Sequence, residues 1–192
     1  LRRYLVAWPG VAIELSEPSV DPELYEGIER GELDLAFCGL PLPEGPFEAL
    51  ELMSDPFVFL VAADGPLGDR EEASLADLGD QPLVSSQVCP AGKIVEEALR
   101  ERGQEPSFAF RSDDNGTVQG LVAAGFGVAL VPLLAVSPGD ERIRVLRVTP
   151  PLPRRRIAVL WHRDRHRSAA ARAFVEIAAE VSRELEASLL EP

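Results

Sequence analysis

The chain has 192 residues, a formal net charge of −13, and 46% hydrophobic against 27% charged residues. This balance is typical of a globular protein and excludes a disordered chain, and no run approaches the about 20 apolar residues of a membrane span. An acidic surface repels phosphate backbones, so we do not expect this chain by itself to bind DNA. The two cysteines, Cys38 and Cys89, favour a reducing cytoplasm over a disulfide-rich secreted scaffold.

The first third of the chain predicts two helices and two strands. Residues 1–8 have apolar side chains on one helical face and end at a Pro-Gly pair. Residues 11–15 alternate between apolar and polar as a strand does, and residues 21–31 form a helix that begins at Asp-Pro. Residues 33–37 then form a strand. Because one helix connects the two strands, we expect them to be parallel.

The middle of the chain continues this α/β pattern. Residues 49–53 and 57–62 predict two strands, of which the second is strongly apolar. A single helical turn follows at 74–78, and then a short strand at 83–84. A helix opens at Pro90-Ala91-Gly92 and closes at Gly103.

The stretch from Ser112 to Pro132 forms the centre of our interpretation. Its polar start offers side chains that can cap a helix, and Gly125 follows the helix where a left-handed residue is favoured. Gly127 permits a close approach of two backbones, and residues 128–131 predict a buried strand. Residues 108–110 predict a strand before the helix, which completes a strand–helix–strand unit.

Two strands and one long helix complete the chain. Residues 143–148 and 157–161 predict the strands, and the prolines within 150–153 form a stiff connector between them. Ser168 is expected to cap a terminal amphipathic helix.

The order of the strands favours two lobes. Residues 1–79 with 153–192 would form the first lobe, and residues 80–152 the second, with a two-strand hinge between them. Polar segments after the strands that end at Phe37, Val84 and Phe110 would face the cleft between the lobes.

The chain resembles the effector-binding domain of LysR-type transcriptional regulators over essentially its whole length. The segments that match, in order, are W-P-G-V, E-G-I-E-R-G-E-L-D-L-A-F, D-P-F-V-F-L-V-A-A-D-G-P-L-G, S-L-A-D-L-G-D-Q-P-L-V, S-D-D-N-G-T-V-Q-G-L-V-A-A-G-F-G-V-A-L-V-P and I-A-V-L-W-H-R. The resemblance implies two Rossmann-like lobes, similar to type 2 periplasmic binding proteins, and a small-molecule effector in the interlobe cleft. It also implies a homodimer or homotetramer. Promoter DNA would be contacted only by a winged helix-turn-helix that is absent here, as is the family's first regulatory-domain strand.

The second lobe offers six candidate effector-binding residues. Ser85, Ser86 and Gln87 precede a helix N-terminus and can hold an anion through hydroxyl and backbone N–H groups; an ordinary polar turn is the alternative. The other three, which follow residues 108–110, are Asp113, Asn115 and Thr117. We expect either Asp113 or Asn115 to cap the helix. If Asp113 faces the pocket, a cationic or hydroxylated effector is favoured over a bare anion.

The first lobe contributes Cys38 and Gly39 at the corresponding strand end. A reactive thiol needs an electropositive setting, and the surrounding sequence is acidic, so Cys38 is interpreted as part of a pocket wall. His162 and His166 have the spacing of a metal pair, but the three interleaved arginines favour a solvated basic loop. No catalytic motif, metal site or cofactor site is expected.

The leading hypothesis is therefore a non-catalytic sensor whose ligand alters how attached DNA-binding domains sit on a promoter. A solute-binding protein of a transport system is the alternative, and would carry an export signal instead of a helix-turn-helix. An enzyme on a related two-lobe fold is a third hypothesis, and would need a catalytic acid or cysteine in the cleft.

Overall fold

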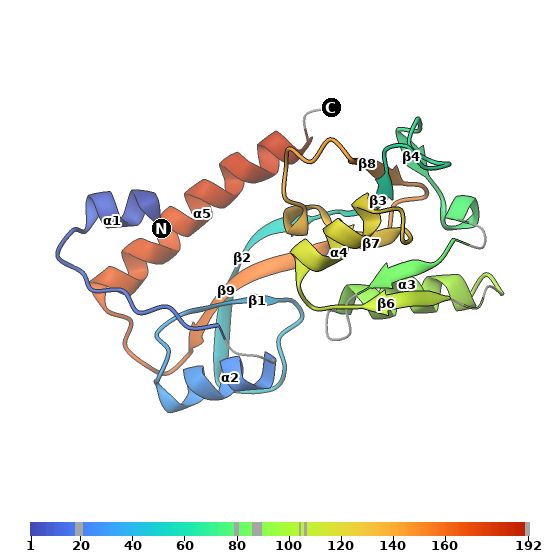
Figure 1. Ribbon diagram of the computed structural model, residues 1–192. Coiled ribbons are helices and arrows are strands. Elements are labelled where there is room, and N and C mark those ends of the chain that lie inside the picture. Colours follow the sequence, from blue (N-terminus) through green and yellow to red (C-terminus); the bar gives the residue numbers. More distant parts are fainter. Residues whose placement is uncertain (18–20, 79–80, 86–89, 104, 106, 191–192) are drawn as a thin grey trace. The chain divides into compact units, whose positions relative to one another are not determined.

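The computed structural model divides the chain into two compact units (Figure 1), Leu1–Ser54 with Arg155–Pro192, and Asp55–Arg154. The chain therefore passes between the units twice, at the end of β2 (Phe47–Asp55) and at the start of β9 (Arg155–His162). The residues that the structure describes are 1–17, 21–78, 81–85, 90–103, 105 and 107–190.

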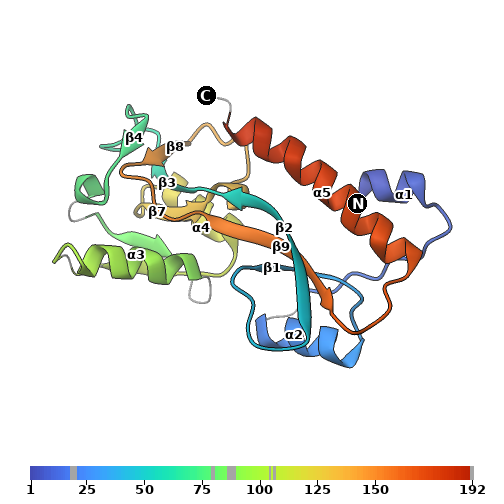
Figure 2. The ribbon, with the colours of Figure 1, turned by 180° about the vertical axis from the view of Figure 1, so that it is seen from behind.

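The first unit contains a three-stranded sheet in the order β1-β9-β2, with β1 (Ala36–Gly39) antiparallel to β9. Alternate residues of β9 face opposite sides of a sheet, and each side is covered by one helix. Leu160 packs with Ile28 of α2 (Asp21–Arg30), whereas Val159 packs with Val175 of α5 (Ala169–Leu190). Figure 2 shows these two helices on opposite sides of the sheet.

The N-terminal helix α1 (Arg2–Ala7) packs on α5. The buried Tyr4 donates its hydroxyl to the carbonyl of Ala170 at 3.0 Å, and its ring meets Phe174 edge-on at 5.2 Å. The strand predicted at residues 11–15 is not formed. Residues 11–17 belong to no strand or helix. The expected parallel pairing is therefore wrong: β1 pairs with β9 instead, and antiparallel.

The second unit contains a four-stranded sheet in the order β4-β8-β3-β7, which the two-stranded β5-β6 sheet adjoins through a bridge from Leu83 to Val128. The strand β3 is antiparallel to β7 and β8, whereas β5 and β6 are parallel. The bounds are β3 (Phe57–Ala62), β4 (Glu72–Ala73), β5 (Leu83–Ser85), β6 (Phe108–Arg111), β7 (Ala129–Pro132) and β8 (Ile143–Val148).

Helices cover both faces of this sheet. The helix α4 (Asn115–Ala123) buries Val118 and Val122 against Leu60 of β3, and α3 (Pro90–Arg100) contributes Ala98 and Leu99 to the core on the other face. The predicted helix end is confirmed, since Gly125 has a φ of 73° and its N–H donates to Val122. Two short 3-10 turns, η1 (Leu75–Leu78) and η2 (Leu133–Ala135), connect the strands.

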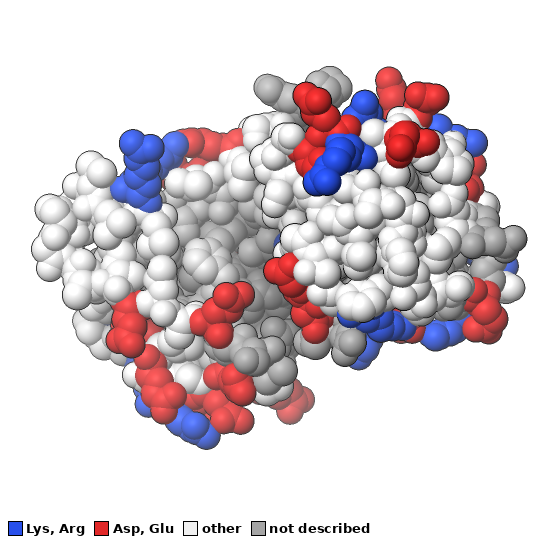
Figure 3. All heavy atoms as spheres, in the orientation of Figure 1, with Lys and Arg blue, Asp and Glu red and all other residues white. Residues whose placement is uncertain are grey.

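The border between the units differs from the one expected at residue 79. The described residues 55–78 belong to the second unit, in which β3 pairs with β7 on one edge and β8 on the other. Only Pro56 separates β2 from β3, so the chain changes sheets within two almost continuous strands. Among the described residues, none of the helices could span a lipid bilayer. Figure 3 shows acidic side chains gathered around α2, where Glu23, Glu26 and Glu29 are exposed.

Candidate functional site

The parallel strands β5 and β6 bring two predicted site segments together. Ser85, the last residue of β5, lies opposite Arg111, and the N–H of Ser112 donates to the Ser85 carbonyl at 2.9 Å. The Ser85 residue is buried, with 7% of its surface exposed. Because the carboxyl ends of parallel strands meet at one edge, Ser85 lies beside the segment that leads into α4.

The first turn of α4 is capped by Asp114. Its carboxylate accepts the N–H of Thr117 at 2.6 Å, and its own N–H donates to the Ser112 hydroxyl at 3.2 Å. Hydrogen bonding from Thr117 to the ionised carboxylate lowers the pKa of Asp114. The expectation that Asp113 or Asn115 caps this helix is wrong, since Asn115 is already its first residue.

Three predicted contact residues lie at the start of this helix. Asp113, Asn115 and Thr117 are all exposed, and the capping carboxylate belongs to none of them. The structure therefore places their side chains at the surface of the second unit, next to the edge where β5 and β6 end.

The cation nearest to this edge in sequence, Arg111, is already engaged. It pairs with Glu96 of α3 at 2.7 Å, and its guanidinium lies over the ring of Phe108 at 3.7 Å from the centroid. Hydrogen bonding from Arg111 lowers the pKa of Glu96, whose side chain is largely buried. The charge of Arg111 is therefore largely offset within the unit.

The first unit carries Cys38 and Gly39 at the end of β1. Cys38 is half-buried opposite Ala158, and Gly39 is exposed opposite Ile157. A Cβ built on Gly39 would meet no atom within 4 Å, so this position has room for a larger side chain. The remaining predicted contacts, Ser86 and Gln87, lie outside the described residues.

The basic loop with His162 and His166 has a structural role. Arg165 donates to the carbonyls of Ile28, at 2.8 Å, and Glu29, and so satisfies the C-terminal end of α2. His162 accepts the N–H of Asp164 at 3.2 Å. In the described ranges, no three His, Cys, Asp or Glu side chains gather as a metal site would need.

The LysR substrate binding domain, as a family model, matches residues 1–183. The chain belongs to this family. The fold predicted from the sequence, an α/β domain of the two-lobed LysR type, is therefore confirmed.

Three known proteins illustrate the similarity of this LysR domain to its relatives. The uncharacterized HTH-type transcriptional regulator YwbI of Bacillus subtilis (strain 168) is 26% identical over 172 residues, which are 88% of this chain and 56% of YwbI. The crystal structure of HinK, a LysR family transcriptional regulator from Pseudomonas aeruginosa, is 25% identical with a TM-score of 0.86, over 96% of this chain and 64% of HinK. The effector binding domain of QuiR in complex with shikimate is 18% identical with a TM-score of 0.78, over 95% of this chain and 88% of that one.

The LysR domain thus spans about half the length of the curated relatives it matches. These relatives are named as transcriptional regulators, which favours the regulator hypothesis over the transport alternative.

Two buried polar residues of the second unit, Asp55 and Gln119, were missed by the sequence interpretation. The sequence signal for Gln119 is an amide that stands between the apolar residues Val118 and Leu121 of the predicted helix. Nothing in the sequence distinguishes Asp55 from the many other acidic residues of the chain. Both residues bond to the segment around η2.

Proposed function

We propose that this domain binds a small-molecule effector through the polar strand ends of its two units. The meeting of Ser85 with Ser112, at the start of α4, is the observation that supports this most directly. The location of the effector in the interlobe cleft remains a prediction from the sequence. The proposed contacts are Cys38, Gly39, Ser85, Ser86, Gln87, Asp113, Asn115 and Thr117.

The charges around α4 support an effector that donates hydrogen bonds there. The carboxylate of Asp114 already accepts the Thr117 N–H, so this helix end does not offer that group to an anion. The neighbouring Asp113 is exposed and adds a second carboxylate, while Arg111 is paired with Glu96. A hydroxyl or ammonium group is therefore the proposed partner of this edge.

We further propose that the whole protein is a non-enzymatic cytoplasmic transcriptional regulator. Its DNA-binding domain, outside this chain, would contact the promoter, and the effector-binding domain would assemble as a homodimer or homotetramer. The names of YwbI and HinK support the regulatory role. The shikimate held by QuiR, a domain of the same fold, supports a small-molecule effector.

A thermal-shift screen of the 192-residue chain tests the proposal. The panel contains amines, polyols, hydroxylated acids and simple carboxylates, and we expect hits among compounds that carry hydroxyl or ammonium groups. A hit should lose its effect in Thr117→Ala and Asp113→Asn, whose exposed side chains can be changed without disturbing the core. A folded protein that no compound stabilises, or hits that both variants retain, would count against the proposed site.

A further inference from the structure

The segment that contains η2 is anchored at its start to the residues where the chain enters the second unit. Leu133 donates its N–H to the carbonyl of Pro56 at 2.9 Å, and Leu134 donates its N–H to the carboxylate of Asp55 at 3.1 Å. Asp55 is fully buried at 0% exposure. The bond itself is partly buried, but its carboxylate belongs to a buried residue, and loss of a hydrogen bond leaves a buried polar group without solvent to replace that bond.

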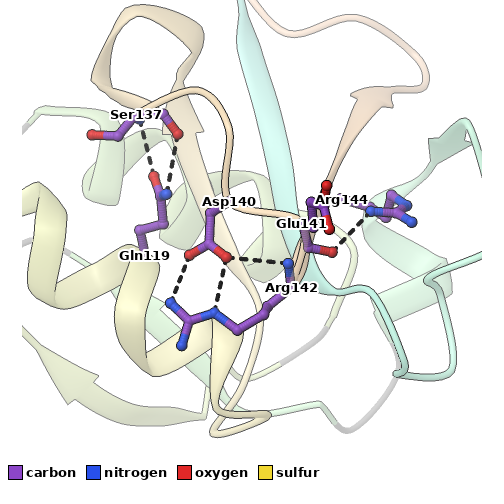
Figure 4. Close-up of polar contacts among 6 residues, drawn as sticks. All are labelled: Gln119, Ser137, Asp140, Glu141, Arg142 and Arg144. Atoms are coloured by element: carbon purple, nitrogen blue, oxygen red, sulfur yellow. Dashed lines mark hydrogen bonds and ion pairs between the residues drawn. The ribbon is translucent and has the colours of Figure 1, made fainter.

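The same segment is anchored at its end to α4. The side-chain amide of Gln119 donates to the Ser137 carbonyl at 3.1 Å, and its oxygen accepts the Ser137 N–H at 3.0 Å (Figure 4). Gln119 is 7% exposed. Both ends of its amide are thus bonded to the backbone of a single residue, which fixes the spacing and the orientation of α4 relative to this segment.

The piece between the two anchors is short and internally bonded. The N–H of Val136 donates to the carbonyl of Leu133 at 3.1 Å, which closes the turn. Val136 also packs against the core cluster that contains Val118 and Val122 of α4. The turn is thus held between its two anchors by one internal hydrogen bond and by the packing of Val136.

We propose that Gln119 and Asp55 are positioning residues that couple α4 to the point where the chain enters the second unit. The physical basis is a series of partly buried hydrogen bonds joined by short backbone links. They run from Gln119 to Ser137, from Val136 to Leu133, and from Leu134 to Asp55. Thr117, a proposed effector contact, lies two residues before Gln119. The regulatory meaning of the coupling therefore rests on the proposed function, whereas the coupling itself is a property of the domain without ligand.

Amide hydrogen exchange, measured by NMR on the 192-residue chain without ligand, tests the coupling. Gln119→Met keeps the length of the side chain and removes both hydrogen bonds to Ser137. Exchange of the Ser137 amide should accelerate locally, and exchange of the remote Leu134 amide should accelerate by about threefold or more. In the opposite direction, Asp55→Ala should accelerate exchange of the Thr117 amide. Asp55→Asn keeps an acceptor oxygen, so in this variant the Thr117 amide should keep most of its protection.

The matched control is Glu141→Gln, an exposed residue of the same region whose carbonyl, rather than its carboxylate, accepts from Arg144 (Figure 4). It should leave the Leu134 and Thr117 amides unchanged. If Asp55→Ala does not fold, the change in exchange of the Leu134 amide caused by Gln119→Met decides by itself whether the coupling exists.

A double variant separates coupling from simple loosening. The readout is the Leu133 amide, whose acceptor, the Pro56 carbonyl, is removed by neither substitution. If the residues are coupled, Gln119→Met with Asp55→Ala should accelerate its exchange by less than the product of the two single effects. A double effect equal to the product, or a response to Gln119→Met confined to Ser137 and its neighbours, overturns the proposal. Because no ligand is used, either result leaves the proposed effector binding to be judged by its own screen.

Discussion

Gly127 lies directly against the backbone of Pro82, so that a Cβ built on Gly127 would be 2.3 Å from the Pro82 carbonyl oxygen. The approach is needed because the N–H of Val128 donates to the same carbonyl at 2.9 Å, and the Val84 N–H donates to Val128 at 2.8 Å. These bonds join β5 to the edge of the larger sheet. The close approach predicted for Gly127 from the sequence is confirmed.

Gly127→Ala should therefore destabilise the domain by roughly 2–4 kcal/mol, because the backbone that the new methyl group meets cannot move without breaking the bridge. The matched control is Gly120→Ala, at an exposed position within α4 where a Cβ meets nothing within 4 Å. The control should stabilise the domain by about 0.5–1 kcal/mol. Urea unfolding measures both, and equal effects of the two substitutions would show that the contact at Pro82 is unimportant.

Asp114→Ala should lower the thermal midpoint at pH 7 by roughly 2–4 °C, because the Thr117 N–H loses its cap. Asp114→Asn should retain much of the capping bond without the charge. Since folding lowers the pKa of Asp114, its contribution is present above the ordinary aspartate pKa of about 3.9 and is lost as the pH falls below it. The difference between wild type and Asp114→Asn should shrink between pH 5 and the most acidic pH at which both still fold, and a constant difference would contradict the assignment.

Arg165→Ala should loosen the last turn of α2, because the carbonyls of Ile28 and Glu29 lose their donor. We expect a loss of about 0.5–1.5 kcal/mol in urea unfolding. Arg163→Ala removes a guanidinium from the same loop, where it only approaches Asp164 at 3.8 Å, and should change stability by less than about 0.5 kcal/mol. If the two arginines behave alike, the loop is a solvated basic surface as the sequence suggested.

Gly39→Ser should fold as stably as the wild type, since the new side chain meets open space at the end of β1. It should nevertheless change the affinity for any compound that emerges from the thermal-shift screen, because a hydroxyl is added at a proposed contact. Isothermal titration of the hit against both proteins measures this. Unchanged affinity would remove Gly39 from the site.

Much of the fold follows from local patterns in the sequence. The apolar run at β3, the polar starts of α4 and α5, and the glycine after α4 each have a local physical cause, and the structure forms these elements near the expected residues. The alternation of apolar and polar residues at Val11, Ile13 and Leu15 led to a wrong strand prediction. Such alternation is compatible with a strand, but it does not provide a neighbouring strand to pair with.

The pairing of strands was harder to predict than their existence. The sequence predicts β2 and β3 in the same lobe. The pairing of β3 with β7 and β8 shows instead that β2 and β3 belong to different units. Similarly, Asp113, Asp114 and Asn115 are all good capping residues, and the sequence cannot choose among them because the choice depends on where the strand before them ends. The roles of Asp55 and Gln119 depend on partners that lie 79 and 18 residues away in the chain.

The most direct test of the effector-binding role is an NMR titration of the isotopically labelled chain with the strongest compound from the screen. We predict saturable shifts concentrated at the amides of Gly39, Ser85 and Thr117, with the affinity reduced by Asp113→Asn. Saturable shifts that spare all three strand ends, or no saturable binding by a folded domain, would contradict recognition of a small molecule by these residues.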